Sequence, residues 1–274
     1  MSAERRFDAA FLGAGGLVLL VAAFAMPRAS DSEAALRTTV AMGSFSAAEG
    51  LVLLVAGILA LRSGQRLEQG TPARLGWTLL GAGLLVLAGG ETIEAVYALR
   101  FGEIDPFPSL ADVFFLGSYP LLTLAFVLFL RAYGLLAEPD PRDRTFAGMA
   151  GFALLALGSL VAYPVLHADT GFAERAISLS YVVLDLGILA PLLLLLRLTW
   201  RFRGGTIWKI WAGILAGFLI TSLADVLFAY FENRAGSVAT LSTPQMHFLS
   251  EVLFLLSYLA IARGTLQQDR LLRA

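Results

Sequence analysis

One stretch decides how the chain is organised: residues 77–119 read WTLLGAGLLVLAGGETIEAVYALRFGEIDPFPSLADVFFLGSY. Two apolar segments are joined by a short Pro-containing connection, and acidic residues stand close to both segments. The pattern returns at 208–258, which read WKIWAGILAGFLITSLADVLFAYFENRAGSVATLSTPQMHFLSEVLFLLSY. In both copies a Trp precedes an acid by 17 residues, and a later acid precedes a Tyr by 7 residues. This spacing predicts two copies of one unit.

Composition assigns the chain to a membrane. Hydrophobic residues make up 58% of its 274 residues and charged residues 15%, and the mean hydropathy is +0.76. A water-soluble domain cannot bury that much apolar surface, so the lipid bilayer is the expected partner. A net charge of −1 gives no basic surface for nucleic acid. The absence of Cys excludes disulfides, thiolate metal sites and Cys nucleophiles.

Eight apolar runs are long enough, at about 20 residues, to cross a bilayer as helices. They lie near 7–27, 44–63, 75–99, 110–133, 145–166, 175–200, 207–231 and 245–265. The first run follows two Arg residues and passes an AFA tripeptide, so a cleaved signal peptide is the alternative. We expect a retained helix, because FLGAGG from Phe11 resembles FAGMAG from Phe146.

The sequence therefore predicts an all-α, polytopic membrane protein with a single membrane domain over 1–274. Repeat one covers about 7–134, repeat two about 145–265, and a short cytoplasmic tail covers 266–274. The paired positions are Phe11/Phe146, Ser44/Ser180, Glu49/Asp185, Trp77/Trp208, Glu94/Asp225, Asp112/Glu251 and Tyr119/Tyr258. Four helices per copy bring both copies in from the same side, which predicts parallel repeats about a pseudo-two-fold axis along the membrane normal. The alternative is that helices of similar composition align by chance.

Basic residues indicate the orientation. Fifteen of the twenty Lys and Arg residues fall in segments that share one side of this topology, and five fall on the other. Positive residues favour the cytoplasmic side. We therefore expect a multi-pass protein of the inner, cytoplasmic membrane of a bacterial cell with both termini in the cytoplasm.

Six acids fall in the outer half of the bilayer in that orientation. Ionisable residues at such depth are costly and usually face a bundle interior or a wet cavity, so they are site candidates. The candidate ligand-binding residues are Asp185, Asp225, Glu251, Glu49, Glu94 and Asp112, with Tyr119 and Tyr258 as hydroxyl donors.

Helix capping is the alternative for two of these acids. SAAE at 46–49 and SLAD at 109–112 fit the capping box, in which an acid three residues after Ser closes a helix N-terminus. No Ser or Thr stands three residues before Asp185 or Glu251, and Asp225 is near a helix C-terminus, where the helix dipole disfavours an anion. The second copy is therefore the stronger candidate for a site.

Oxygen ligands without Cys suit a hard cation such as Ca²⁺, Mg²⁺ or Mn²⁺, or an organic cation. His247 stands one turn before Glu251, so Asp225, His247 and Glu251 are the metal candidates, although a His at a helix entrance is commonly just interfacial. The carboxyls can instead be protonated and hydrogen-bonded, because burial favours the neutral form. No cofactor is indicated. No P-loop, GxSxG, HExxH or dinucleotide fingerprint is present, so we expect no enzyme.

The stretch FPSLADVFFLGSYPLLTLAFVLFLRAYG at 107–134 resembles the N-terminal multi-helix membrane regions of bacterial GGDEF-type diguanylate cyclases and histidine kinases, which carry P-S-x-A-D and then Y-P. SYVVLDLGILAPLLLLLRL at 180–198 is similar to their aromatic-then-Asp helix, but has Tyr181-Val182 where Tyr-Pro is common. The resemblance covers about half the helices and implies a sensory input module, with Asp112 and Asp185 at the matching acidic positions.

The given sequence stops shortly after Gly264, where an output domain follows in the resembling proteins. The expectation is a membrane-embedded sensory or ligand-binding module that signals through a separate protein partner. The alternatives are a non-catalytic subunit of a larger membrane complex and a small secondary transporter.

Overall fold

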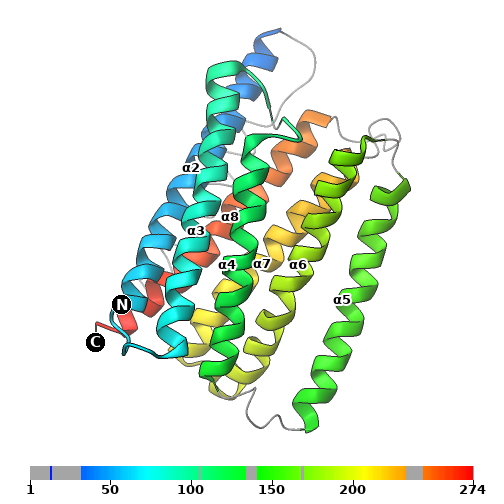
Figure 1. The fold of residues 1–274 in the computed structure, drawn as a ribbon. Helices are drawn as coiled ribbons and strands as arrows, with labels where there is room; N and C mark the ends of the chain where they lie inside the picture. The colour runs from blue at the N-terminus through cyan, green and yellow to red at the C-terminus, as the bar shows by residue number, and fades with distance from the viewer. Residues whose placement is uncertain are drawn as a thin grey trace.

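The computed structural model describes residue 13 and residues 32–104, 106–133, 141–167, 170–232 and 243–273. This part of the chain is all-helical and contains no strand. Its long helices form one up-and-down bundle (Figure 1). The elements are α2 (Ser32–Gln65), α3 (Pro72–Val96), η1 (Tyr97–Phe101), α4 (Leu110–Ala132), α5 (Pro141–His167), α6 (Phe172–Thr199), η2 (Trp200–Phe202), α7 (Thr206–Glu232) and α8 (Thr243–Leu271).

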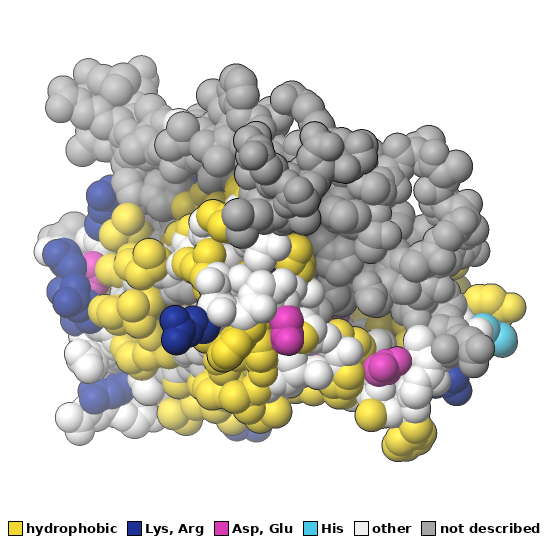
Figure 2. Space-filling view, turned by 90° about the horizontal axis from the view of Figure 1, so that it is seen from above, with side chains coloured by type: hydrophobic (Ala, Val, Ile, Leu, Met, Phe, Trp, Pro, Cys, Tyr) yellow, Lys and Arg dark blue, Asp and Glu magenta, His cyan; other side chains and the backbone are white. Residues whose placement is uncertain are grey.

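The described chain contains seven helices that are long and apolar enough to cross a membrane. Large hydrophobic side chains lie on their outer faces, as at Phe152 (77% exposed) and Leu160 (72% exposed) of α5. Figure 2 shows hydrophobic side chains over much of the described surface, with charged ones between them. The protein is therefore a helical membrane protein. The expected first span at 7–27 lies outside the described residues, apart from Gly13.

Neighbouring helices in the bundle are not always neighbours in sequence. The helix α2 packs on α3 and α8, α4 packs on α3 and α6, and α7 packs on α6 and α8. The helix α5 stands at the edge of the bundle, mainly against α6 (Figure 1). Contacts between α2 and α8 and between α4 and α6 close the bundle around a shared core.

Basic residues gather at the lower end of the bundle in Figure 1, where α2, α4, α6 and α8 end. They are Arg62, Arg66, Arg74, Arg131, Arg142, Arg144, Arg197, Arg201, Arg203, Lys209, Arg263, Arg270 and Arg273. We call this the arginine end. Near the opposite end, the described chain has Arg37, Arg100 and Arg175.

An aromatic cluster fills the bundle near the arginine end. The Trp77 ring lies 5.2 Å from the Phe129 ring and 5.8 Å from the Trp211 ring, and Phe129 and Trp211 lie 4.7 Å apart, centroid to centroid. All three side chains are buried. Trp77 and Phe129 belong to the first predicted repeat and Trp211 to the second, so residues of both predicted repeats pack in one core. Trp211 Nε1 also donates a hydrogen bond to the Tyr133 hydroxyl at 3.0 Å.

The helix α2 differs from its expected bounds. It begins at Ser32 rather than near 44, because the preceding SEAALRTTVAMG is rich in good helix formers although it is too polar at its start to be seen as a membrane span. The capping alternative for Glu49 is therefore wrong, since Ser46 lies in mid-helix and its hydroxyl bonds the Met42 carbonyl. The corresponding alternative for Asp112 is confirmed, because Ser109 and Asp112 form a capping box at the start of α4.

The helix α8 continues through most of the segment expected as a tail and ends at Leu271. Asp269 is fully buried there. Its carboxylate lies 2.8 Å from Nη1 of Arg66, which directly follows α2, and 2.6 Å from Arg273 Nη2. An ion pair with a buried carboxylate thus joins the C-terminal end of α8 to the residue that follows α2.

Candidate functional site

A cavity of about 490 Å³ lies in the half of the bundle opposite the arginine end, between α3, α4, α6, α7 and α8, with α5 on one side. Seven acids line it, namely Glu91, Glu94, Asp112, Glu174, Asp185, Asp225 and Glu251. Among the described residues that line it, there is no Lys, Arg or His. The described wall of the cavity is therefore strongly acidic.

The structure brings the predicted residues together. Seven of the eight line the cavity, namely Asp185, Asp225, Glu251, Glu94, Asp112, Tyr119 and Tyr258. Glu49 lies behind the wall, with 0% of its surface exposed, beside Glu251 and Glu91. The eight residues come from six helices, so their meeting results from packing and not from local sequence.

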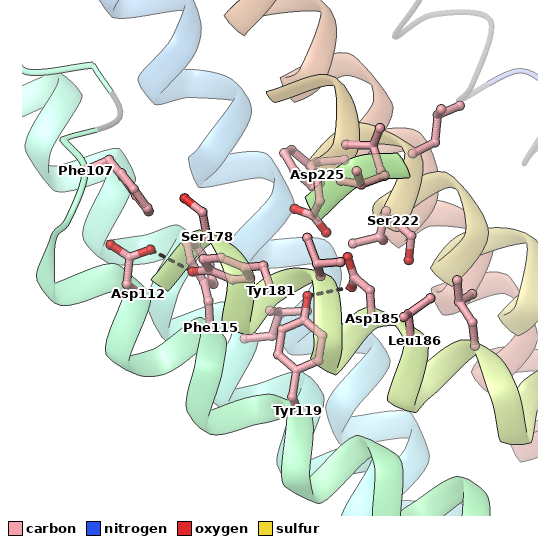
Figure 3. A pocket seen from close by; sticks show the side chains of 18 of the residues that line it. Phe107, Asp112, Phe115, Tyr119, Ser178, Tyr181, Asp185, Leu186, Ser222 and Asp225 are labelled. Carbon is pink, nitrogen blue, oxygen red and sulfur yellow. Dashed lines mark hydrogen bonds between the residues drawn. The ribbon is translucent and has the colours of Figure 1, made fainter. Parts of the chain in front are cut away.

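Asp112 combines a structural and a cavity role. Its Oδ2 accepts a hydrogen bond from the Ser109 backbone N–H at 2.6 Å, which completes the cap of α4. Its Oδ1 accepts a hydrogen bond from the Tyr181 hydroxyl of α6 at 2.7 Å (Figure 3). Capping therefore fixes this carboxylate in place without removing it from the cavity.

Tyr119, Asp185 and Asp225 form a linked group from α4, α6 and α7. The Tyr119 hydroxyl donates to Asp185 Oδ1 at 2.8 Å (Figure 3). Ser222 and the Asp225 carboxyl, both of α7, lie close to the Asp185 carboxyl. Asp225 Oδ2 is buried, with no hydrogen-bond partner among the described residues. We call these three residues the aspartate triad.

Tyr258, Glu91 and Glu49 form a second linked group, from α8, α3 and α2. The Tyr258 hydroxyl donates to Glu91 Oε1 at 2.8 Å. Both oxygens of Glu49 are buried and receive no hydrogen bond from any donor of the described chain, and the Glu91 carboxyl is one of its close neighbours. We call these three residues the glutamate triad. Glu251 lies beside it and accepts a hydrogen bond from Ser46 at 3.2 Å.

Charge neutrality limits what this site can be. Two carboxylates 4 Å apart repel by about 4 kcal/mol at an effective dielectric constant of 20. Neighbouring acids in such a site cannot all be ionised unless a cation is present, so they hold protons or receive positive charge. The aromatic side chains of Phe115, Tyr181 and Phe254 also line the cavity, and aromatic faces attract organic cations.

A metal ion has less support. No group of three His, Asp or Glu in the described chain is arranged to hold one. The side chain of His247, predicted as a possible ligand beside Asp225 and Glu251, is outside the described set. The geometry of the described acids therefore suits protons or an organic cation better than a coordinated metal.

Sequence reasoning missed several cavity residues. Glu91 lies in the stretch at 77–119, but its repeat position is Ser222, so pairing of acids between the copies does not single it out. Tyr181 pairs with Asp112 across two helices, which no local pattern reveals. Glu174 begins α6 as a capping acid and also reaches the cavity.

The fold and the site define a class: an all-helical membrane protein with an acidic, partly aromatic cavity in one half of its bundle. Comparison with protein-family models, with curated proteins and with solved structures gave no match for this chain. The function must therefore be argued from the site itself.

Proposed function

We propose that the protein is a membrane-embedded sensory or ligand-binding module whose cavity receives an organic cation. The observation that carries this proposal is the wall itself: seven acids and no described basic residue surround about 490 Å³. That volume lies in the range of small-molecule sites, which are mostly apolar with a few placed polar groups. The role we propose is binding, with no catalytic step.

The proposed architecture is eight membrane helices in two parallel repeats. The described helix contacts support it, because exchanging α2 with α6, α3 with α7 and α4 with α8 converts each contact pair among these six helices into another that is also present. For example, the contact of α2 with α8 becomes that of α6 with α4. The cavity then lies where the two copies meet, as in other proteins built from membrane repeats.

The proposed location is the inner membrane of a bacterium, with both termini in the cytoplasm and the cavity in the outer half of the bilayer. The support is the concentration of Lys and Arg at the arginine end, because such residues favour the cytoplasmic side. A ligand would then arrive from outside the cell, as a sensory input requires.

The helix α8 provides a route for a signal. It carries Glu251 and Tyr258 beside the cavity and Asp269 at the arginine end, where Asp269 forms an ion pair with Arg66, just after α2. A ligand that moves α8 would change this ionic contact at the cytoplasmic side, where a protein partner would read it. The resemblance to sensory membrane regions supports this relay.

The test is ligand-dependent thermal stabilisation of the purified protein against a panel of organic cations. Wild-type protein is expected to be stabilised, since a ligand that binds the native state stabilises it by mass action. The triple variant Asp185→Asn, Asp225→Asn, Glu251→Gln is expected to lose that shift. Asp143→Asn, an acid of α5 at the arginine end, is the matched control and should keep it. Unchanged melting with every cation would refute the proposal.

Secondary transport is the second candidate, because a cavity between two repeats is a common transporter feature. The buried aromatic cluster of Trp77, Phe129 and Trp211 favours binding over transport, since it fills the bundle between the cavity and the arginine end. Uptake of a labelled cation by proteoliposomes separates the two functions: saturable flux would support transport.

A further inference from the structure

The aspartate triad and the glutamate triad have the same composition. In each, a Tyr hydroxyl donates a hydrogen bond to one carboxyl, and a second carboxyl lies close to the first. The helices that supply them, α4, α6 and α7 for one and α8, α2 and α3 for the other, exchange under the repeat relation given above. The same polar arrangement has thus been built twice, from different acids, on the two sides of one cavity.

Two carboxyls that lie close together in a buried site need a proton or another cation to offset their repulsion. Two ionised carboxylates have four acceptor oxygens and no donor, so they repel, whereas one shared proton makes the pair a hydrogen bond. In the glutamate triad the inner carboxyl, Glu49, is fully buried and finds no donor in the described chain. In the aspartate triad, Asp225 Oδ2 is likewise buried and has no hydrogen-bond partner among the described residues. These buried, unpartnered oxygens are the observation that points to a bound proton.

The charged groups around each triad reinforce this. Glu49 of α2 faces Glu91 and Glu94 of α3 and Glu251 of α8. The aspartate pair faces Tyr119 of α4 and Ser222 of α7, and Glu91 of α3 is close enough to act on Asp225. Among the described residues, these neighbours are acidic or neutral.

We propose that each triad is a proton-binding site and that a cation entering the cavity displaces a proton from it. The exchange is balanced: a cation and a carboxylic acid become a cation–carboxylate pair and a proton released to water. In each triad the Tyr hydroxyl remains as a donor and stabilises the carboxylate that is left behind. This inference rests on the proposed function, because it describes how the same cavity binds its cation.

The affinity for the cation should therefore depend on pH. If one proton leaves for each monovalent cation bound, the dissociation constant rises about tenfold for each unit by which the pH falls, over the range in which the triads are protonated. A permanent cation is the right probe, since it cannot itself exchange a proton. Tetraphenylphosphonium also carries the apolar rings that the cavity wall would accept.

The experiment is calorimetric titration of tetraphenylphosphonium into the full chain in detergent, in buffers that differ in ionisation enthalpy and at several pH values around neutrality. Wild-type protein is expected to bind and release about one proton per cation, by the linkage relation. The double variant Glu49→Gln, Asp225→Asn replaces both unpartnered acids by amides that can donate to Glu91 and Asp185. It is expected to bind without proton release and without the tenfold pH dependence.

The outcomes separate the two proposals. Binding that releases no proton and does not vary with pH overturns the proton sites and leaves the cation-binding function intact. No binding at any pH overturns both. If the double variant still releases a proton per cation, the proton comes from elsewhere and the triads are not its source. The variant Glu68→Gln, an acid at the arginine end, should match wild-type protein throughout.

Discussion

Removing Arg66 is expected to destabilise the protein more than removing Asp269, although the two form one ion pair. The Asp269 side chain is 0% exposed, whereas that of Arg66 is 36% exposed. In Asp269→Asn, Arg66 reaches water and keeps its 3.1 Å hydrogen bond to the residue 269 carbonyl, so the cost should be about 1 kcal/mol, as for a partly exposed pair. In Arg66→Ala the buried carboxylate keeps Arg273 alone, whose side chain is 53% exposed. Because losing one partner of a fully buried pair costs about 3–5 kcal/mol, we expect about 2–3 kcal/mol here.

The measurement is equilibrium unfolding in mixed micelles for the two single variants and the double variant. Arg62→Ala is the matched control, because Arg62 lies one turn earlier on α2, is exposed, and has no ion pair in the described structure. The double variant should be more stable than Arg66→Ala, since its buried position no longer carries a charge. If Arg66→Ala lowers the unfolding free energy no more than Asp269→Asn does, the Asp269 carboxylate does not depend on Arg66 and the ion pair does not hold α8 in place.

Two further variants test the packing and the cap. Gly217→Ala should lower the unfolding free energy by about 1–3 kcal/mol through overpacking, since its Cβ would clash with Ile261 Cγ1 and lie 2.7 Å from the Ser257 carbonyl oxygen of α8. Gly148→Ala, where nothing lies within 4 Å, should be neutral or stabilising, and equal effects of the two would contradict the close approach of α7 and α8. Ser109→Ala should cost about 1 kcal/mol in the same assay through loss of the cap. Ser159→Ala, an exposed serine that bonds only within α5, should cost less; if it does not, the cap contributes nothing.

The sequence predicted the parts of the fold that depend on local composition. Apolar runs identify the seven described membrane helices, and the Ser109–Asp112 spacing identifies a real cap. The start of α2 was predicted wrongly because its first turns are helical but too polar at their start to register as a membrane span. Hydropathy identifies only the part of a helix that lies in the bilayer, whereas the helix itself can continue beyond the membrane.

The site was predictable as a set of acids but not as a set of contacts. Depth in the membrane follows from position along each helix, so the shared level of Asp112, Asp185 and Glu251 could be calculated. The partner of each acid depends on how helices rotate and lean against one another. Tyr119 therefore bonds an acid of α6, while Tyr258 bonds Glu91 of α3, a residue with no acidic counterpart in the other copy.

Because Glu91 has no acidic counterpart, the two sides of the cavity are not equivalent. If the two proposed copies were identical, the two triads would be equivalent and a ligand would meet them equally. In the sequence alignment of the copies, Glu91 corresponds to Ser222, so the glutamate side carries one carboxyl where the aspartate side carries a neutral hydroxyl. The glutamate triad is also the more enclosed, because Glu49 lies behind the wall while both aspartates line the cavity. A cation should therefore exchange first with the aspartate triad, and the glutamate triad should hold its proton longer.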